Sequence, residues 1–346
     1  MRKKGVVLIS ELIHNLFKYA TSELSHSAYW AWIISSLQVP DQQDLAGPRR
    51  IAQRIFDYCN INKPDPPLEV DTEVQHDEAP NSRIDVLVRS DDKPVVAIEN
   101  KVQALISVDQ VERYRDALGC DVICFSTSFD VGRDLPEYYL DLDALIEISE
   151  VEAASHPLVA DHVEWMKQLK AERKQLYCLA TSGSVESQLE ALSRAEGQWY
   201  YMQWLTDCID GSQYRGTSHG RPWTQLRFYH GHNRRDSLFY RIDKYKKGYY
   251  VSLRQYQKPP QPSWDEKERR RDQLRQIWQE CFERVSPSLD RNKPNNRGKN
   301  ESEIACFLVH QQDPKHFKKG LSKLHEAFVE ALIDQGWSEG HFGENS

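Results

Sequence analysis

The chain has 346 residues and a net charge of −7, with 39% hydrophobic residues, 28% charged residues and a mean hydropathy of −0.70. This composition predicts a hydrophilic globular protein of one large or two smaller domains. No apolar run approaches the roughly 18 residues that cross a bilayer, so we expect no membrane segment. The short apolar run near the start is below the length of a signal sequence, and seven scattered cysteines without a Cys-x-x-Cys pair indicate free thiols. We therefore expect a cytoplasmic protein.

Helical patterns come first along the chain. Residues 10–37 have apolar side chains at helical spacing, as one helix or as two that are interrupted near residues 21–23. A second helix is expected over residues 48–60, because proline suits the first turn. One face of the first region mixes an acid, an imidazole and a hydroxyl group with an aromatic ring: Glu23, His26, Ser27 and Trp30.

Strands follow. Alternating residues predict a strand over 68–75, and two apolar runs around a polar turn predict a hairpin over 82–101. A helix over 105–118, a strand over 121–127, a short apolar segment over 142–148 and a helix over 150–172 complete this part. The order helix, three strands, helix, strand predicts an α/β domain with a mixed sheet.

The pattern changes near residue 185, which predicts a second domain. We expect domains over residues 1–175 and 185–346, the second being an α+β domain. Its predicted elements are helix over 185–208, strands within 222–257, a basic helix over 264–285, a loop over 286–301 and a closing helix over 316–335.

Basic residues gather in this second part. Residues 211–300 contain 21 Lys and Arg against 9 Asp and Glu, an asymmetry that favours nucleic-acid contact; a solvated face or a protein-binding surface is the alternative. Stacking on Trp223, Tyr229 or Tyr240 would add to such binding. The candidate nucleic-acid-binding residues are Arg234, Arg235, Lys244, Lys246, Lys247, Arg269, Arg270 and Arg271.

The hairpin contains three charged residues that an apolar strand does not need. Glu99 and Lys101 are two apart and share a face of their strand. A two-residue turn would pair residue 90 with residue 93 and send Asp85 to the opposite face. A three-residue turn would pair residue 90 with residue 94 and bring Asp85 opposite Glu99. We adopt the second register, which gathers two carboxylates and one ammonium group.

Such a group favours a hard divalent cation. Mg²⁺ or Mn²⁺ takes oxygen ligands, and Asp85, Glu99 and the backbone carbonyl of Asn100 can supply them. Lys101 beside the ion can orient a water molecule or neutralise charge on a scissile phosphate. The residues therefore predict metal-assisted hydrolysis of a phosphodiester.

The same residues resemble a known signature. Asp85, thirteen residues and then Glu99-Asn100-Lys101 resemble the Asp…Glu-x-Lys motif of the PD-(D/E)XK nuclease superfamily. The flanking runs at 83–88 and 96–101 resemble the "RIDVLI…IENK" form of one bacterial branch. Further similarities are a Glu-x-x-His-Ser helix, a Gln-x-x-x-Tyr helix and a Phe-Ser-Thr strand end: Glu23, His26, Ser27, Gln110, Tyr114 and residues 125–127.

The resemblance implies a restriction-endonuclease-like αβββαβ core with a mixed sheet and a Mg²⁺- or Mn²⁺-dependent nuclease. It implies that Asp85 and Glu99 bind metal and that Lys101 positions water. It also implies that Glu23 reaches the site and that Gln110 orients water or a phosphate. DNA is the expected substrate, with RNA left open, and bacterial defence against phage is the implied setting. The alternative is a catalytically silent nucleic-acid- or protein-binding module; a protein partner or a homo-oligomer stays open.

Overall fold

The computed structural model divides the chain into two compact units, residues 1–172 and residues 173–346. It describes Phe17 and residues 22–39, 41–76, 79–102, 104, 106–129, 135–218, 220–231, 236–245, 248–257, 264–285, 289, 291–292, 301–309, 313–337 and 341–342. Among these residues, no helix is both long enough and apolar enough to cross a membrane.

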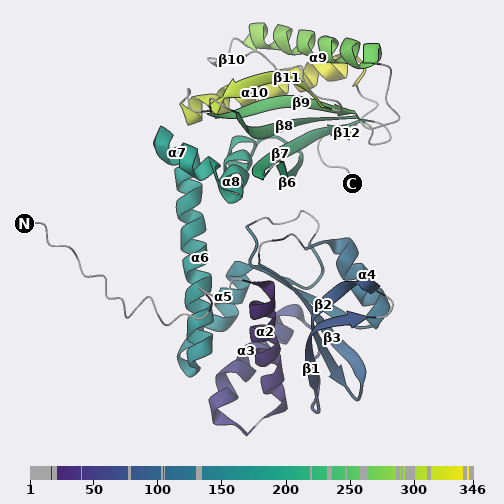
Figure 1. The fold of residues 1–346 in the computed structure, drawn as a ribbon, viewed down its shortest axis with the longest axis vertical. Coiled ribbons are helices and arrows are strands. Elements are labelled where there is room, and N and C mark those ends of the chain that lie inside the picture. Colours follow the sequence, from purple (N-terminus) through teal and green to yellow (C-terminus); the bar gives the residue numbers. More distant parts are fainter. Residues whose placement is uncertain are drawn as a thin grey trace, which may run out of the picture. The chain divides into compact units, whose positions relative to one another are not determined.

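The first unit is a five-stranded mixed sheet with helices on both faces (Figure 1). The strands lie in the order β1 (Glu69–His76), β2 (Ala79–Ser90), β3 (Lys93–Lys101), β4 (Asp121–Ser126) and β5 (Tyr139–Leu140). Pairing is antiparallel from β1 to β3 and parallel from β3 to β5. The helices are α2 (Glu23–Ser35), η2 (Ser36–Gln38), η3 (Gln43–Leu45), α3 (Ala46–Cys59), α4 (Val108–Leu118), α5 (Leu142–Glu150) and η4 (Ala153–Ser155).

Alternation along β3 divides the core of this unit between the two faces of the sheet. Val96 and Ile98 pack with residues of α2, α3 and α5. Ala97 packs on the other face with Val111 and Tyr114 of α4. Residues 99 and 101 alternate in step with Ala97, so the sequence directs Glu99 and Lys101 towards the α4 face.

Local sequence signals explain where these helices begin and end. Ser22 caps α2 by accepting a hydrogen bond from the backbone N–H of Ser25. Gly119, with φ of 64°, ends α4 in the left-handed conformation that glycine adopts without strain. Because α2 begins at residue 23, Glu23 lies in its first turn, at one end of the helix.

The five-stranded mixed sheet with its helices confirms the predicted restriction-endonuclease-like fold class. The predicted apolar segment 142–148 lies within the helix α5, which is capped by Asp141. The predicted loop at 286–301 is wrong at two places, because residues 291–292 form the short strand β10 and residue 301 begins another strand. A further strand at 212–218 carries weak alternation and was not predicted.

The second unit is built on an antiparallel sheet with one hydrophobic core. The strand order is β10 (Arg291–Asn292), β11 (Glu301–Leu308), β9 (Gly248–Gln257), β8 (Asp236–Tyr245), β7 (Arg221–His230) and β12 (His341–Phe342), and β6 (Ser212–Ser218) also pairs with β7. The helices α7 (Val185–Leu192), α8 (Ala195–Leu205), α9 (Trp264–Val285) and α10 (Pro314–Asp334) contribute to the core. Helix α6 (Pro157–Ser182) contains the boundary between the units.

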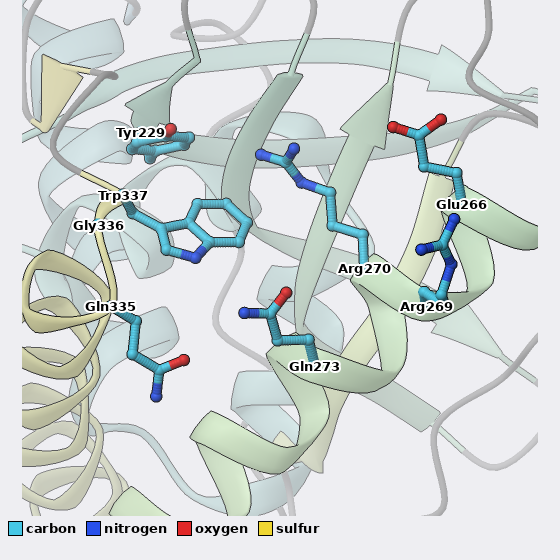
Figure 2. Close-up of a pocket in the computed structure, with 8 residues that line it drawn as sticks. All are labelled: Tyr229, Glu266, Arg269, Arg270, Gln273, Gln335, Gly336 and Trp337. Atoms are coloured by element: carbon cyan, nitrogen blue, oxygen red, sulfur yellow. The ribbon is translucent and has the colours of Figure 1, made fainter.

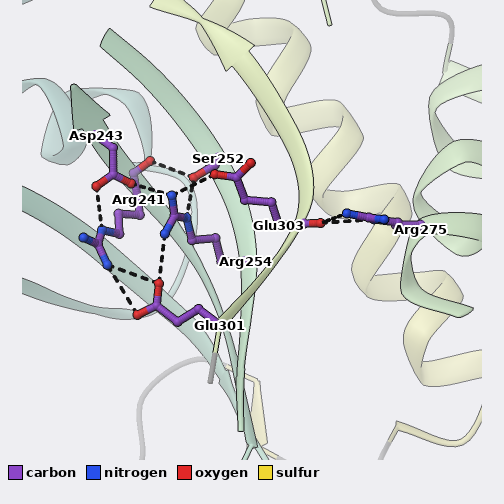
Figure 3. Close-up of polar contacts among 7 residues, drawn as sticks. All are labelled: Arg241, Asp243, Ser252, Arg254, Arg275, Glu301 and Glu303. Atoms are coloured by element: carbon purple, nitrogen blue, oxygen red, sulfur yellow. Dashed lines mark hydrogen bonds and ion pairs between the residues drawn. The ribbon is translucent and has the colours of Figure 1, made fainter. Parts of the chain in front are cut away.

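One face of this sheet carries a network of charges (Figure 3). Tyr240 and Ile242 of β8 belong to the core, so the alternating Arg241 lies on the opposite face. Arg254 of β9 pairs with three acids: Asp243 and Glu303 at 2.8 Å each, and Glu301 at 2.9 Å. These arginines are matched by carboxylates within the sheet, so they add little to a basic surface.

Candidate nuclease site

The tip of the β2–β3 hairpin differs from the prediction. Asp91 and Asp92 have φ of 50° and 60°, and Ser90 pairs with Lys93. Positive φ at both central residues is typical of the two-residue turn that fits the twist of a hairpin. The predicted three-residue turn, with Ser90 opposite Pro94, is therefore wrong.

A β-bulge in the strands compensates for the shorter turn. Arg89 pairs with Pro94, whereas Val88 pairs with Val96, so Val95 is the extra residue of the bulge. Proline has no N–H to give to a ladder and is tolerated at such irregular positions. From Val88 back towards Asp85, the observed strand register is therefore the one that the sequence analysis adopted.

This register brings Asp85 and Glu99 to the same place. Val86 pairs with Ile98, and one further step along both strands sets Asp85 opposite Glu99. Both carboxylates are buried, with exposed fractions of 7% and 1%. The backbone N–H of Asn100 donates to Oδ2 of Asp85 over 2.7 Å, which attaches the two strands beyond the last ladder pair.

One oxygen of Glu99 is held by two donors. Nζ of Lys101 lies 2.6 Å from Oε1 of Glu99, and Nε2 of Gln110 donates to the same oxygen over 2.9 Å. Gln110 also donates to the hydroxyl group of Tyr114, which donates to the backbone carbonyl of Arg83. The other oxygen, Oε2 of Glu99, is buried and has no hydrogen-bond partner among the described residues.

The start of α2 closes another side of the site. Oε2 of Glu23 lies 3.8 Å from Nζ of Lys101. The side-chain amide of Asn100 donates to Oγ of Ser27 over 3.3 Å and to the backbone carbonyl of Glu23 over 3.4 Å. Ser27 thus has a structural role, because its hydroxyl group accepts a hydrogen bond from Asn100.

His26 points into a different environment. Its Nδ1 lies 3.2 Å from Nε2 of the buried His162, and the rings of Phe17 and Trp165 pack beside it. Burial lowers the pKa of His26 to about 4, so the imidazole is neutral at physiological pH. His26 therefore serves packing within the helical layer.

Electrostatics at the hairpin are dominated by burial. Desolvation raises the pKa of Asp85 to about 6, although the N–H of Asn100 and the charge of Lys101 favour the ionised form. Desolvation and the charge of Asp85 raise the pKa of Glu99 to about 7. Burial alone would lower the pKa of Lys101, but Glu99, Asp85 and Glu23 raise it above its ordinary value. The ammonium group is therefore charged, and the two carboxylates repel each other.

Glu73 adds a further acid beside this pair. It lies between Thr72 and Val74, which pair with Val86 and Ile84, and its φ of 55° is unusual for a residue other than glycine. The charge of Glu73 contributes to the raised pKa of Asp85.

Comparison with known proteins assigns this unit to a family. Residues 14–127, from before α2 to the end of β4, match the profile of the PD-(D/E)XK nuclease superfamily. This segment belongs to that superfamily. No curated protein and no solved structure matched the chain. The matched segment contains every residue of the hairpin site, so the chain carries a nuclease-type domain.

PD-(D/E)XK nucleases use divalent metal ions, and the residues present fit such an ion. Two buried carboxylates face each other, and Oε2 of Glu99 has no partner in the part of the chain that the structure describes. Within the described ranges no cluster of three or more His, Cys, Asp or Glu side chains is suited to a metal. A donor set of two carboxylates completed by backbone carbonyl and water is the kind that Mg²⁺ accepts.

The structure describes four of the eight predicted nucleic-acid-binding residues of the second unit, Lys244 and Arg269 to Arg271. Arg234, Arg235, Lys246 and Lys247 lie outside the described residues. Lys244 lies over the ring of Tyr249 near the end of β8. The start of α9 lies by Tyr229, which pairs with Leu238 of β8. Leu238 is six residues before Lys244 in the same strand, so roughly 20 Å of strand separates Lys244 from the start of α9.

The three consecutive arginines of α9 also differ from one another. Arg269 is exposed, whereas Arg270 lies over the indole ring of Trp337 at 4.3 Å. Arg271 pairs with Asp272 at 2.9 Å and with Glu268 at 3.5 Å. The predicted stacking role of Tyr240 is wrong, because its ring is fully buried beside His325.

Proposed function

We propose that the N-terminal unit is a divalent-metal-dependent nuclease that hydrolyses phosphodiester bonds, with DNA as its substrate. The observation that carries this proposal is Oε2 of Glu99, which is buried opposite Asp85 and has no hydrogen-bond partner from any residue that the structure describes. A buried carboxylate oxygen without a donor is costly, and a bound cation removes that cost.

Asp85, Glu99 and the backbone carbonyl of Asn100 would hold the ion, for which we propose Mg²⁺ or Mn²⁺. In an extended strand the N–H and the C=O of one residue point to the same neighbouring strand. The N–H of Asn100 points to Asp85, so its carbonyl lies on the same side. When bound, the ion polarises a phosphoryl oxygen and lowers the pKa of a coordinated water molecule.

Lys101 supplies the positive charge that hydrolysis needs. Its ammonium group lies between Glu99 and Glu23 and stays protonated because both acids raise its pKa. A fixed ammonium group can donate to the attacking water and stabilise charge that develops on the phosphate. Glu23 limits where the flexible lysine side chain can lie.

Gln110 is a positioning residue in this proposal. Its amide group holds Oε1 of Glu99 and is itself fixed by Tyr114, which in turn is fixed to the β2 backbone. Both donors on Glu99 use Oε1, so Oε2 is left for the ion. Support of this kind behind a metal ligand sets its orientation and affinity.

A cleavage assay tests the proposal. Supercoiled plasmid, single-stranded DNA and RNA are incubated with the protein and Mg²⁺ or Mn²⁺. We expect Asp85→Asn, Glu99→Gln and Lys101→Met to lose activity by about 100-fold or more. Asp92→Asn and Lys93→Met are matched controls from the exposed tip of the same hairpin and should cleave normally.

Equal cleavage by all variants would show that a contaminant cuts the substrate and would overturn the assignment. A folded wild-type protein that cuts none of the three substrates and binds no Mn²⁺ would favour a catalytically silent module. For the biological setting we propose defence against phage, which follows from the resemblance to a bacterial branch. Phage plating on cells that express wild-type or Glu99→Gln protein tests that setting.

A further inference from the structure

A cavity of about 340 Å³ lies in the second unit, where one face of α9 meets the end of α10. Glu266, Arg269, Arg270 and Gln273 occupy positions i, i+3, i+4 and i+7 of α9, which places them on one face of the helix. Tyr229 of β7 and the segment Gln335–Trp337 complete the lining. Its size is within the range of small-molecule sites.

Aromatic groups form the buried part of this cavity (Figure 2). Trp337 and Tyr229 are buried, and their ring centroids are 5.6 Å apart. The guanidinium group of Arg270 lies 4.3 Å from the centroid of the Trp337 ring. An arginine stacked on an aromatic ring keeps a fixed orientation.

Polar groups occupy the mouth of the cavity. Arg269 and Glu266 are exposed on α9, and Gln273 of α9 and Gln335 after α10 also line the cavity (Figure 2). The neighbouring Arg271 is directed into ion pairs with Asp272 and Glu268. Arg269 and Arg270 therefore line the cavity, whereas Arg271 forms ion pairs on the surface of the helix.

We infer that this cavity binds a nucleoside phosphate. The two guanidinium groups match a phosphate, which arginine recognises through paired N–H donors. The two glutamine amides offer a donor and an acceptor each, which matches the edge of a nucleobase. Glu266 accepts from a ribose hydroxyl or an exocyclic amine, and the aromatic wall suits a planar base.

Other ligand classes fit less of the lining. A small inorganic anion would use the arginines and leave the aromatic wall and both amides without a role. An acidic peptide would meet Glu266 at the mouth with like charge. The nucleoside phosphate could come from two sources, a free nucleotide or the terminal nucleotide of a nucleic-acid strand.

Isothermal titration of the full chain tests the inference, with EDTA present so that the hairpin site does not act. The probes are purine and pyrimidine nucleoside mono- and triphosphates, a 5′-phosphorylated oligonucleotide, its 5′-hydroxyl form and inorganic phosphate. We expect at least one nucleotide to bind with a micromolar Kd. Arg269→Glu and Gln273→Ala should weaken that binding about tenfold or more, a change of about 1.4 kcal/mol per tenfold.

Two matched controls should leave binding unchanged. Arg221→Glu changes the same charge at the far end of β7, and Gln276→Ala changes an exposed glutamine of α9 that bonds to Glu280 outside the cavity. Because all these positions are exposed, circular dichroism should show that each variant folds. A Glu99→Gln variant should bind nucleotide as the wild type does, since this inference does not depend on the nuclease proposal.

The outcomes separate the two sources. Tight binding of the 5′-phosphorylated strand over its hydroxyl form assigns the cavity to strand ends, and tight binding of free nucleotides assigns it to a soluble ligand. Absence of binding by every nucleotide and oligonucleotide would overturn the inference. Equal affinity for inorganic phosphate, or unchanged affinity in Arg269→Glu and Gln273→Ala, would overturn it as well.

Discussion

Two buried carboxylates that face each other are an unfavourable arrangement for a folded chain. Desolvation raises the pKa of Asp85 to about 6 and the pKa of Glu99 to about 7. Lys101 and Gln110 compensate through one oxygen of Glu99 only. The two carboxylates therefore repel each other, and a bound cation would reduce this repulsion. The repulsion affects how stability depends on pH and how single substitutions act.

The first consequence concerns stability against pH. Both folded-state pKa values exceed the ordinary carboxyl values near 4, so the folded state retains protons that the unfolded chain releases. Stability that is present below about pH 4 is lost as the pH rises through about 7. Without metal, we expect the Tm of wild type to fall by several degrees relative to Glu99→Gln between about pH 4.5 and 7.5.

Thermal unfolding with EDTA and then with Mg²⁺ measures this difference. Added Mg²⁺ should restore the Tm of wild type near neutral pH and leave Glu99→Gln unchanged. Parallel pH curves for the two proteins would contradict the raised pKa values.

The second consequence concerns Gln110. Gln110→Ala removes a donor to Glu99 and an interaction of Tyr114 at once. We expect kcat to fall about tenfold with little change in KM, because the orientation of a metal ligand changes and substrate contacts do not. Tyr114→Phe should act in the same direction and more weakly. Arg113→Ala, an exposed neighbour on α4, is the control; a change in KM alone would instead indicate that Gln110 touches substrate.

At the scale of elements, the hairpin shows what a sequence can and cannot specify. The apolar runs and the Asp91-Asp92 break indicated both strands and their turn. The facing of Asp85 and Glu99 was correctly inferred, but the extra residue was assigned to the turn and lies in β3. An extra residue in the turn and an extra residue in a β-bulge shift the pairing of the strands by the same amount from Val88 towards Asp85. Sequence alone therefore could not show which of the two is present.

This equivalence makes deletion of Val95 informative. Without Val95 the strands pair regularly from Ser90 and Lys93 onward, and Asp85 still faces Glu99. We expect the deletion variant to cleave substrate and to lose about 1–2 kcal/mol of stability through lost packing. Insertion of alanine between Ala97 and Ile98 should abolish cleavage, because it sends the glutamate to the other face. A folded but inactive Val95 deletion would show that the bulge itself shapes the site.

The second unit marks the limit of prediction at this scale. Helix α9 was predicted with its observed bounds because its apolar residues recur at helical spacing. Strand β6 contains Gly216 and five polar or charged residues, so it lacks the alternation that reveals a half-buried strand. The cavity on α9 was also missed, although the spacing from Glu266 to Gln273 was visible. Trp337 and Tyr229 are distant in sequence, and only the fold brings them to that helix face.

At the scale of the molecule, charge is divided between the units. Residues 1–172 contain 17 Lys and Arg against 30 Asp and Glu, whereas residues 173–346 contain 28 against 22. An acidic nuclease unit gains little from attraction to a polyanion, so we expect the second unit to supply most of the contact with nucleic acid.

Salt dependence checks this expectation. DNA affinity of the full chain, measured with EDTA present, should fall steeply with salt. Lys244→Glu should weaken binding several-fold and reduce the slope, because Lys244 is exposed. Lys63→Glu makes the same change of net charge in the acidic unit and should have a smaller effect. Equal effects of both substitutions would indicate that net charge alone governs binding.

Asn100 has a consequence for how this chain tolerates variation. The side chain at the middle position of Glu-x-Lys takes no part in the proposed chemistry, so variation is expected there. In this protein its backbone N–H holds Asp85, while its side chain holds the first turn of α2 through Ser27 and Glu23. Substitution at residue 100 would release the helix that positions Glu23 beside Lys101. In a saturation library over residues 99–101 that is selected for activity, substitutions should therefore be depleted at all three codons. We expect residue 100 to be constrained by its contacts with α2, and residues 99 and 101 by catalysis.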